Sequence, residues 1–215
     1  MGLFQRKDQF SISKQSFSIG ASKTLLFVGL GNPGPEYSGS RHNIGFECID
    51  AFFANRAAGE LSNWTDDAKF KALTCSGNID GTRVILAKPT TYMNLSGESV
   101  ELILNYYKIP VGSMVVVHDE LDINFGQIKT SIGGSSAGHN GVQSVMDKVG
   151  DGFIRLRIGI GPKTPPQIDG ADFVLAKFNI EEQAQLENLF KEVAANLTEL
   201  IYNPSPQTEV RSFLV

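Results

Sequence analysis

Several side chains that could together form a site for acid–base chemistry stand where apolar segments of this chain end. Asn32 follows the first long apolar run, Met93 and Asn94 come shortly after a second, and Asp119 lies at the end of a third. If these runs are neighbouring strands, the four residues converge on one rim of a sheet together with His42. Imidazole titrates near neutral pH and suits a general base, a carboxylate can fix its tautomer, and asparagine supplies neutral donors and an acceptor.

The segment GLGNPG at 29–34 has the spacing G-x-G-x-x-G of dinucleotide-binding loops. That function requires a helix to start at the last glycine, so that its N-terminus can hold a pyrophosphate. Here a proline stands on each side of the last glycine, and helical spacing begins only at Asn43. No second strand ends in an acidic residue about 20 residues later. We therefore reject dinucleotide binding and expect the glycines to form a tight turn that projects Asn32.

A second glycine-rich segment, GGSSAGHNG at 133–141, precedes a short predicted helix. It places Asn140 near a helix N-terminus, a position that favours anions. We expect His118 and His139 to have structural roles as hydrogen-bonding partners of loops, not catalytic ones.

Neither a metal site nor a covalent nucleophile is indicated. The three histidines lack the short spacing of helical zinc sites, so we expect no metal. Ser135 and Ser136 have no adjacent base and no nucleophile-elbow sequence around them, so we expect no covalent intermediate.

The composition is that of an ordinary globular domain, with 215 residues of which 41% are hydrophobic and 20% charged. No apolar run has the roughly 18 residues that a membrane helix needs. Cys48 and Cys75 are expected to be reduced and buried, as in a cytosolic-type compartment. The net charge of −4 argues mildly against a nucleic-acid-binding protein, although a local basic patch could still bind RNA.

The first 23 residues show no hydrophobic period and are rich in serine. We expect residues 1–23 to form a flexible extension and residues 24–215 to form a single folded domain. The extension is poor in acidic residues, as organelle transit peptides are, but it holds a single arginine, which favours an inert tail.

Strand-like and helix-like segments alternate from residue 24 onward. This alternation predicts an α/β fold with three layers, in which a mixed, largely parallel twisted sheet is covered by helices on both faces. Strands are predicted over 24–31, 114–120, 125–134 and 153–161, with two more around the turn NIDG in 70–89. Helices are predicted over 43–58, over 96–108 with Ser96 as N-cap, over 140–149 and over 180–202.

Five motifs in register identify the chain as similar to a known family. GLGNPGPEYSGSRHNIGFE, KPTTYMNLSGESV, HDELD, GGSSAGHNG and RLRIGIG occur in this order, with these separations, within residues 24–205. The chain thereby resembles the bacterial-type peptidyl-tRNA hydrolases.

The resemblance implies hydrolysis of the ester between a peptide and the 3′ ribose of tRNA, which recycles tRNA from stalled or aborted translation. It assigns His42 as the general base that activates water and Asp119 as its partner, with no metal or other cofactor. Asn94 is the preferred oxyanion donor, and Tyr37 is expected near the 3′ end of the tRNA. The implied substrate-binding residues are Asn32, Tyr37, Met93, Asn94 and Asn140.

The resemblance also implies a tRNA contact through Lys129 and Arg157, because cations bind phosphates. The chain has Ser131 where the family commonly has a second lysine, and Pro162 where it often has histidine. These two differences reduce the positive charge expected on the tRNA-binding surface. A cytoplasmic monomer that needs neither a membrane nor a protein partner is the implied form.

Each candidate residue also has a structural interpretation. His42 could cap the helix that begins at Asn43, Asp119 could be a strand-end turn residue as Glu120 and Asp122 are expected to be, and Asn94 could form an Asx turn. Met93 is as compatible with core packing as with function. The segment 163–176 could form a lid over the site.

Two other functions compete with the hydrolase. A catalytically silent homologue could bind RNA or a protein partner, as splicing-factor relatives on the same fold do. The presence of the complete polar set argues against it: His42, Asp119, Asn32, Asn94 and Asn140. A nucleoside phosphorylase-like enzyme would need an Arg or Ser cluster for phosphate, which the sequence lacks.

Overall fold

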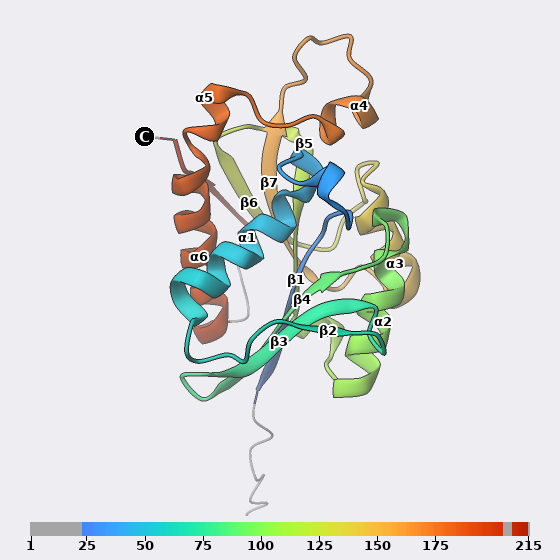
Figure 1. The fold of residues 1–215 in the computed structure, drawn as a ribbon, viewed down its shortest axis with the longest axis vertical. Helices are drawn as coiled ribbons and strands as arrows, with labels where there is room; N and C mark the ends of the chain where they lie inside the picture. Colours follow the sequence, from blue (N-terminus) through green and yellow to red (C-terminus); the bar gives the residue numbers. More distant parts are fainter. Residues whose placement is uncertain (1–22, 204–207, 215) are drawn as a thin grey trace, which may run out of the picture.

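The structure, a computed structural model, describes residues 23–203 and 208–214, so the predicted extension lies outside the described residues except for Lys23. The described chain forms a mixed sheet with helices on both faces (Figure 1), which confirms the predicted α/β class. The strand order is β2-β3-β4-β1-β5-β7-β6-β8. The strands are β1 (Thr24–Gly29), β2 (Thr65–Asp67), β3 (Ala72–Ile79), β4 (Thr82–Pro89), β5 (Met114–Asn124), β6 (Gln127–Ile132), β7 (Ile154–Gly161) and β8 (Glu209–Ser212).

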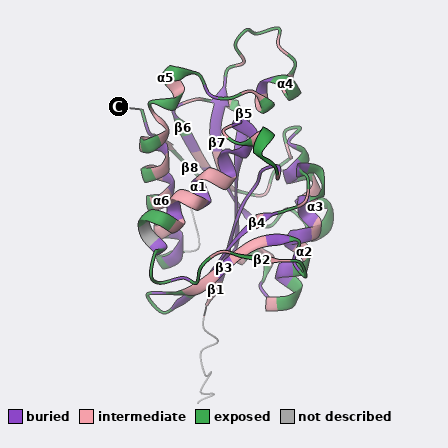
Figure 2. Cartoon of the chain, viewed as in Figure 1, coloured by how far each residue is buried: buried purple, intermediate pink, exposed green. Residues whose placement is uncertain are grey.

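The parallel part of the sheet is confined to its centre. Strands β4, β1, β5 and β7 run parallel to one another, whereas β2–β3–β4 on one side and β7–β6–β8 on the other are antiparallel. The central strands are buried on both faces, as Figure 2 shows, which explains why they read as continuous apolar runs. Strand β7 is the exception, because it is parallel to β5 although its sequence IRLRIGIG alternates.

Helices α1 and α6 cover one face of the sheet, and α2 and α3 cover the other (Figure 1). Apolar side chains such as Phe27 and Phe52 fill the first layer, and Val116 and Val145 belong to the second. The α-helices are α1 (Ile44–Phe52), α2 (Ser96–Tyr107), α3 (Asn140–Val149), α4 (Gly170–Leu175), α5 (Ile180–Gln183) and α6 (Leu186–Tyr202).

Two predicted helices differ from the observed ones. The segment 180–202 is divided into two helices: α5 begins with a capping box formed by Asn179 and Glu182, and α6 begins after Gln185. The segment 43–58 is α-helical only through Phe52 and continues as a π-helical turn, Phe53–Ala57.

The prediction that Ser96 is the N-cap of α2 is also wrong. Leu95 occupies the N-cap position without a side-chain cap, and Ser96 Oγ instead donates to Met93 O at 2.9 Å. The preceding 3-10 turn, Met93–Leu95, supplies the approach to the helix, so the serine hydroxyl stabilises that turn.

Both cysteine thiols are free and buried, as expected. Burial raises the pKa of Cys48 well above its ordinary value and raises the pKa of Cys75 to about 12. Within the described ranges, no helix has the length and apolar character needed to cross a membrane.

Unequal strand lengths create the rim at which the polar residues meet. Strand β1 ends at Gly29, which pairs with Val117, but β5 continues to Asn124. Asp119 therefore lies beyond the end of β1, although it is inside a strand and not at a strand end. Glu120 and Asp122 likewise lie within β5 and are not turn residues, contrary to expectation.

Close backbone packing brings the start of α1 onto this rim. A Cβ atom added at Gly45 would lie 2.4 Å from Val117 O and 2.5 Å from Leu30 O, and one added at Gly29 would lie 2.3 Å from Gly45 O. Such distances allow no side chain. The glycines of the 29–34 segment thus permit strand and helix to touch, and the first α-helix after them starts only at Ile44.

We predict that Gly45→Ala destabilises the protein by about 1–3 kcal/mol or more, because the added methyl group must push α1 away from backbone atoms that cannot rotate aside. Urea unfolding monitored by circular dichroism measures the change. Gly112→Ala is the matched control, since the nearest atom to its added Cβ lies 3.9 Å away. Equal midpoints for the two variants would contradict the assigned contact.

Candidate active site

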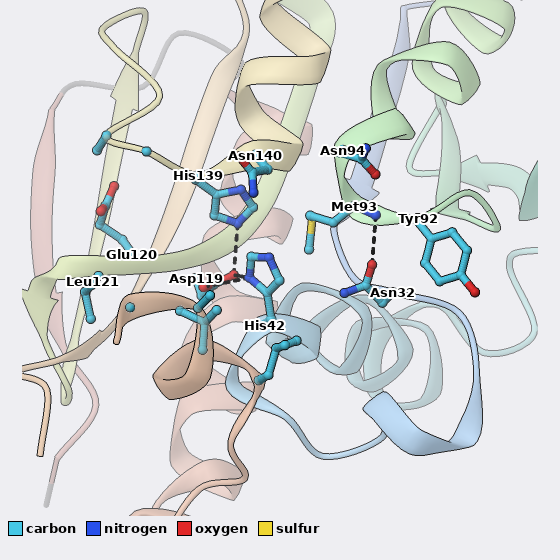
Figure 3. Close-up of a pocket in the computed structure, with 16 residues that line it drawn as sticks. Asn32, His42, Tyr92, Met93, Asn94, Asp119, Glu120, Leu121, His139 and Asn140 are labelled. Atoms are coloured by element: carbon cyan, nitrogen blue, oxygen red, sulfur yellow. Dashed lines mark hydrogen bonds and ion pairs between the residues drawn. The ribbon is translucent and has the colours of Figure 1, made fainter. Parts of the chain in front are cut away.

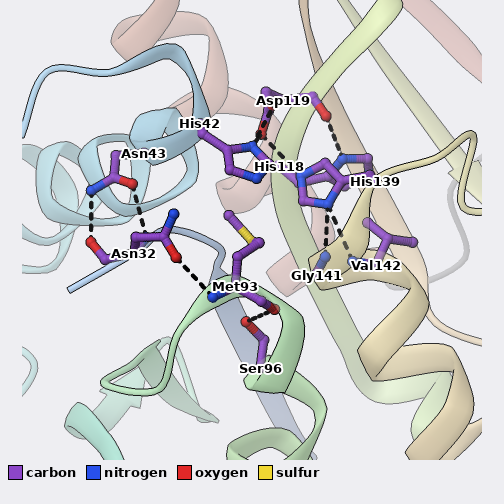
Figure 4. A network of polar contacts seen from close by, with 10 residues as sticks. All are labelled: Asn32, His42, Asn43, Met93, Ser96, His118, Asp119, His139, Gly141 and Val142. Atoms are coloured by element: carbon purple, nitrogen blue, oxygen red, sulfur yellow. Dashed lines mark hydrogen bonds and ion pairs between the residues drawn. The ribbon is translucent and has the colours of Figure 1, made fainter. Parts of the chain in front are cut away.

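The carboxylate of Asp119 joins two histidines that come from different elements (Figure 4). His42 Nδ1 lies 2.9 Å and 3.0 Å from its two oxygens, and His139 Nε2 lies 2.9 Å from Oδ1. Asp119 is only 2% exposed. Burial by itself would raise the pKa of this carboxyl, but the electrostatic attraction and hydrogen bonds of His139 and His42 outweigh it and hold the pKa well below its usual range. Asp119 is therefore an ionised acceptor.

The tautomer of His139 follows from its neighbours. Its Nδ1 accepts the backbone N–H groups of Gly141 and Val142 at 3.1 Å and 3.2 Å, so the ring proton is on Nε2, which donates to Asp119. His139 is also the N-cap of α3. The expectation of a purely structural role is thus incomplete, because the same ring caps a helix and supports the buried carboxylate.

His42 is oriented by the same carboxylate. Because ionised Asp119 only accepts, His42 Nδ1 carries the proton of the neutral ring, and Nε2 is left as the basic nitrogen. The ring caps no helix: the 3-10 turn Arg41–Asn43 and α1 both lack a side-chain cap. This excludes the alternative in which His42 is only a helix cap.

His118 lies behind the pair and stays neutral. Burial lowers its pKa to about 3, with a further contribution from nearby His139. Its Nδ1 lies 2.6 Å from the backbone oxygen of Asp119, to which it donates, and its ring packs edge-on against His139. This arrangement agrees with the structural role expected of His118.

The group His42, Asp119 and His139 also resembles a metal-binding set, because its ligand atoms lie within 4.8 Å of one another. The hydrogen bonds oppose this interpretation. Two backbone N–H groups keep the proton of His139 on Nε2, the atom that would have to bind the ion. The group fits a hydrogen-bonded relay better than a metal site.

A second polar network fixes Asn32. Asn43 holds both backbone groups of Asn32: its Oδ1 accepts from Asn32 N at 2.8 Å, and its Nδ2 donates to Asn32 O at 2.9 Å. The Asn32 side chain accepts from Met93 N through Oδ1 at 2.8 Å. Because the oxygen of this amide is occupied, its NH₂ group is the end available to a ligand. Sequence reasoning treated Asn43 only as the start of a helix.

These networks border one pocket of about 630 Å³ (Figure 3). Of the predicted site residues, six line it: Asn32, His42, Met93, Asn94, Asp119 and Asn140. Met93 is buried, whereas Asn94 and Asn140 are exposed. Tyr37 ends the 3-10 turn Pro35–Tyr37 and is not among the lining residues.

Some lining residues were not anticipated as site residues. Tyr92 flanks Met93, and Glu120 and Leu121 extend β5 past Asp119. A further wall is formed by α4, which belongs to the segment considered as a lid. Its lining residues are Gly170, Ala171, Val174 and Leu175.

Lys129 and Arg157 lie next to each other beside this pocket. They are direct partners across the antiparallel pair β6–β7. Arg157 Nη1 is 3.8 Å from Oε2 of Glu120, which lines the pocket. Ser131 follows two residues after Lys129 on the same strand and pairs with Arg155. The two predicted cations thus lie side by side at the edge of the site.

The buried neutral His118 predicts acid sensitivity. Below pH 6.5, the ordinary pKa of histidine, the unfolded chain protonates this ring while the folded chain does not until about pH 3, so stability falls as pH decreases through this window. His118→Asn keeps a donor near Asp119 O and removes the titration, so this variant should lose less free energy of unfolding between pH 7 and pH 5. Urea unfolding at both values measures the difference. An unchanged pH dependence would show that His118 is not the group responsible.

Comparison with known proteins agrees with this geometry. The family model described as peptidyl-tRNA hydrolase matches residues 26–213. The chain is 45% identical over 178 residues to the peptidyl-tRNA hydrolase of Pelagibacter ubique, covering 82% of this chain and 92% of that protein. It is 47% identical over 168 residues to the chloroplastic peptidyl-tRNA hydrolase of Arabidopsis thaliana, covering 77% of this chain but only 56% of that longer protein.

A solved structure shows the same fold. The crystal structure of peptidyl-tRNA hydrolase from Acinetobacter baumannii superimposes with a TM-score of 0.71 at 34% identity, over 87% of this chain and 97% of that one. Together with the family match over residues 26–213, this shows that the chain belongs to the peptidyl-tRNA hydrolase family.

Proposed function

We propose that this chain hydrolyses the ester bond of peptidyl-tRNA with His42 as general base and Asp119 as the carboxylate that orients it. The observation that carries the proposal is the pair of hydrogen bonds from His42 Nδ1 to a buried, ionised Asp119 at the wall of the pocket. In the neutral ring they place the proton on Nδ1, so Nε2 can accept one, as a general base requires.

The reaction proceeds by direct attack of water. Water adds to the ester carbonyl carbon while its proton passes to His42 Nε2, and Asp119 stabilises the resulting imidazolium. As the tetrahedral intermediate collapses, the bond to the ribose oxygen breaks and the imidazolium returns the proton to that oxygen. The products are a free peptide carboxylate and tRNA. A positioned base contributes about 10²–10⁴ to such a rate.

Asparagine side chains supply the remaining polar contacts. Asn94 donates to the developing oxyanion, and Asn32 holds the ester end of the substrate through its free NH₂ group. Asn140, the first residue of α3, contacts the peptide and helps to place the water. Within the described residues the Asn94 and Asn140 side chains make no hydrogen bond to protein, which leaves their donors available. Met93 and Tyr37 complete the binding surface, Met93 in the pocket wall and Tyr37 towards the tRNA end.

The patch of Lys129 and Arg157 binds phosphates of the tRNA. It adjoins the pocket through Glu120, so a nucleic acid held there would place its 3′ end near His42. The protein acts as a cytoplasmic monomer whose catalytic domain is 24–215 and which needs no metal or protein partner.

The central test is release of N-acetyl-amino acid from acylated tRNA in the presence of EDTA. The wild type should turn over, and His42→Ala should lose about 10²–10⁴ in kcat, because water then lacks its base. Asp119→Asn should fall in the same way, since the amide cannot stabilise an imidazolium. Circular dichroism confirms folding of each variant. A folded wild type without activity would leave a binding protein as the function, and activity abolished by EDTA alone would show a metal requirement.

The basic patch predicts a graded salt dependence. Lys129→Ala should raise KM, leave kcat unchanged, and reduce the slope of log affinity against log salt by about 0.7–0.9, because one phosphate contact is lost. Ser131→Lys should steepen the slope by a similar amount. Lys191→Ala is the control, since Lys191 pairs with Glu187 on α6, away from the pocket. Identical slopes for all three variants would place the tRNA elsewhere.

A further inference from the structure

The α4 wall of the catalytic pocket is held by contacts outside the pocket. Helix α4 has six residues, of which only Phe173 is buried. The chain then continues through Ala176–Asn179 into the four-residue helix α5 (Figure 1). Helices this short have little intrinsic stability in water, so their position depends on tertiary contacts.

Arg41 provides most of these contacts. Its backbone N–H donates to Ala176 O at 3.0 Å, and its Nη1 reaches Ala176 O at 3.3 Å and Lys177 O at 2.7 Å. Its Nη2 donates to Glu182 Oε2 at 2.6 Å. One residue therefore binds the end of α4, the linker and α5. The neighbouring Ser40 adds a β-bridge with Lys177.

The guanidinium is also enclosed by aromatic rings. It lies 4.3 Å from the ring centroid of Phe173 and 5.2 Å from that of Phe178. Arg41 is 6% exposed, and the Glu182 side chain is 15% exposed. Planar stacking, a charge partner and two carbonyl acceptors suit arginine and not lysine, whose ammonium is a compact point charge. Breaking such a pair leaves an uncompensated buried charge.

Arg41 and His42 belong to the same 3-10 turn, Arg41–Asn43. The turn directs His42 to Asp119 and Arg41 to the α4–α5 segment. The same turn therefore positions both the proposed base and the α4 wall of the pocket. Glu182 binds Arg41 and also caps the start of α5. Its Oε2 atom accepts from Arg41 Nη2 and from Asn179 N, the latter at 2.8 Å.

We propose that Arg41, clamped to Glu182, is a positioning residue that fixes α4 as the wall of the catalytic pocket against which the acyl group of the substrate packs. Arg41 itself touches no substrate. The wall it holds presents Val174 and Leu175 to the pocket, an apolar surface suited to the peptide and not to the tRNA. This inference rests on the proposed ester hydrolysis.

The test compares Arg41→Gln, Arg41→Lys and Glu182→Gln with the wild type on N-acetyl-aminoacyl-tRNA. Loss of the clamp should raise KM at least tenfold, change kcat by less than threefold and leave the pH profile of kcat unchanged, because the bonds between His42 and Asp119 remain. Arg41→Lys should raise KM less than Arg41→Gln does, because lysine keeps the positive charge that pairs with Glu182. Glu199→Gln is the matched control, since it removes a 2.6 Å ion pair between Glu199 on α6 and Arg211 on β8 and should leave KM unchanged.

Limited trypsinolysis gives a readout that does not depend on activity. Lys177 is exposed within the clamped linker, so cleavage after it should be faster in Arg41→Gln than in the wild type or in Glu199→Gln. Unchanged KM and unchanged cleavage in folded variants would overturn the proposal. A shifted pH profile with a loss of kcat would also overturn it, because Arg41 would then act on His42. An inactive wild type with accelerated cleavage in the variant would refute the hydrolase function and retain the clamp.

Discussion

The buried carboxylate of Asp119 is the constraint on which the site depends. An ionised carboxylate that is almost fully removed from water is costly unless donors surround it, and here both donors are imidazoles. One comes from the turn before α1 and the other from the N-terminus of α3. The fold must therefore bring both faces of the sheet to the same point, and β5 must extend past β1 so that Asp119 can reach them.

The two histidines use the carboxylate differently. His139 is fixed by two backbone N–H groups on Nδ1, so its proton stays on Nε2 and it acts as a permanent donor. His42 has no such restraint on its outer nitrogen, which borders the pocket. The contrast arises from position alone: His139 is the N-cap of α3, whereas His42 lies two residues before Ile44, where α1 begins. One residue type thus serves as scaffold in one place and, in the proposed reaction, as base in the other.

The charge distribution reconciles an acidic chain with a nucleic-acid substrate. The net charge is −4, yet Lys129 and Arg157 lie side by side across β6 and β7 at the edge of the pocket. Arg41 and Arg155, by contrast, are buried cations that bind backbone oxygens of segments bordering the site. Counting arginines cannot separate these roles, because the distinction lies in what each guanidinium faces. Local register, not overall charge, brings these two cations together.

The sequence by itself determined the α/β class, the central strands and the family, because apolar runs, turn residues and five motifs in order are local signals. It also placed six site residues that line the pocket. Only the tertiary structure decided that His139 and His42 both hydrogen-bond to Asp119, that Asn43 binds the backbone of Asn32, and that α4 lines the pocket. These contacts join residues far apart in the chain, and hydrogen bonds between distant segments leave no periodic trace. The pairing of Glu182 with Arg41, 141 positions away, is a contact of the same kind.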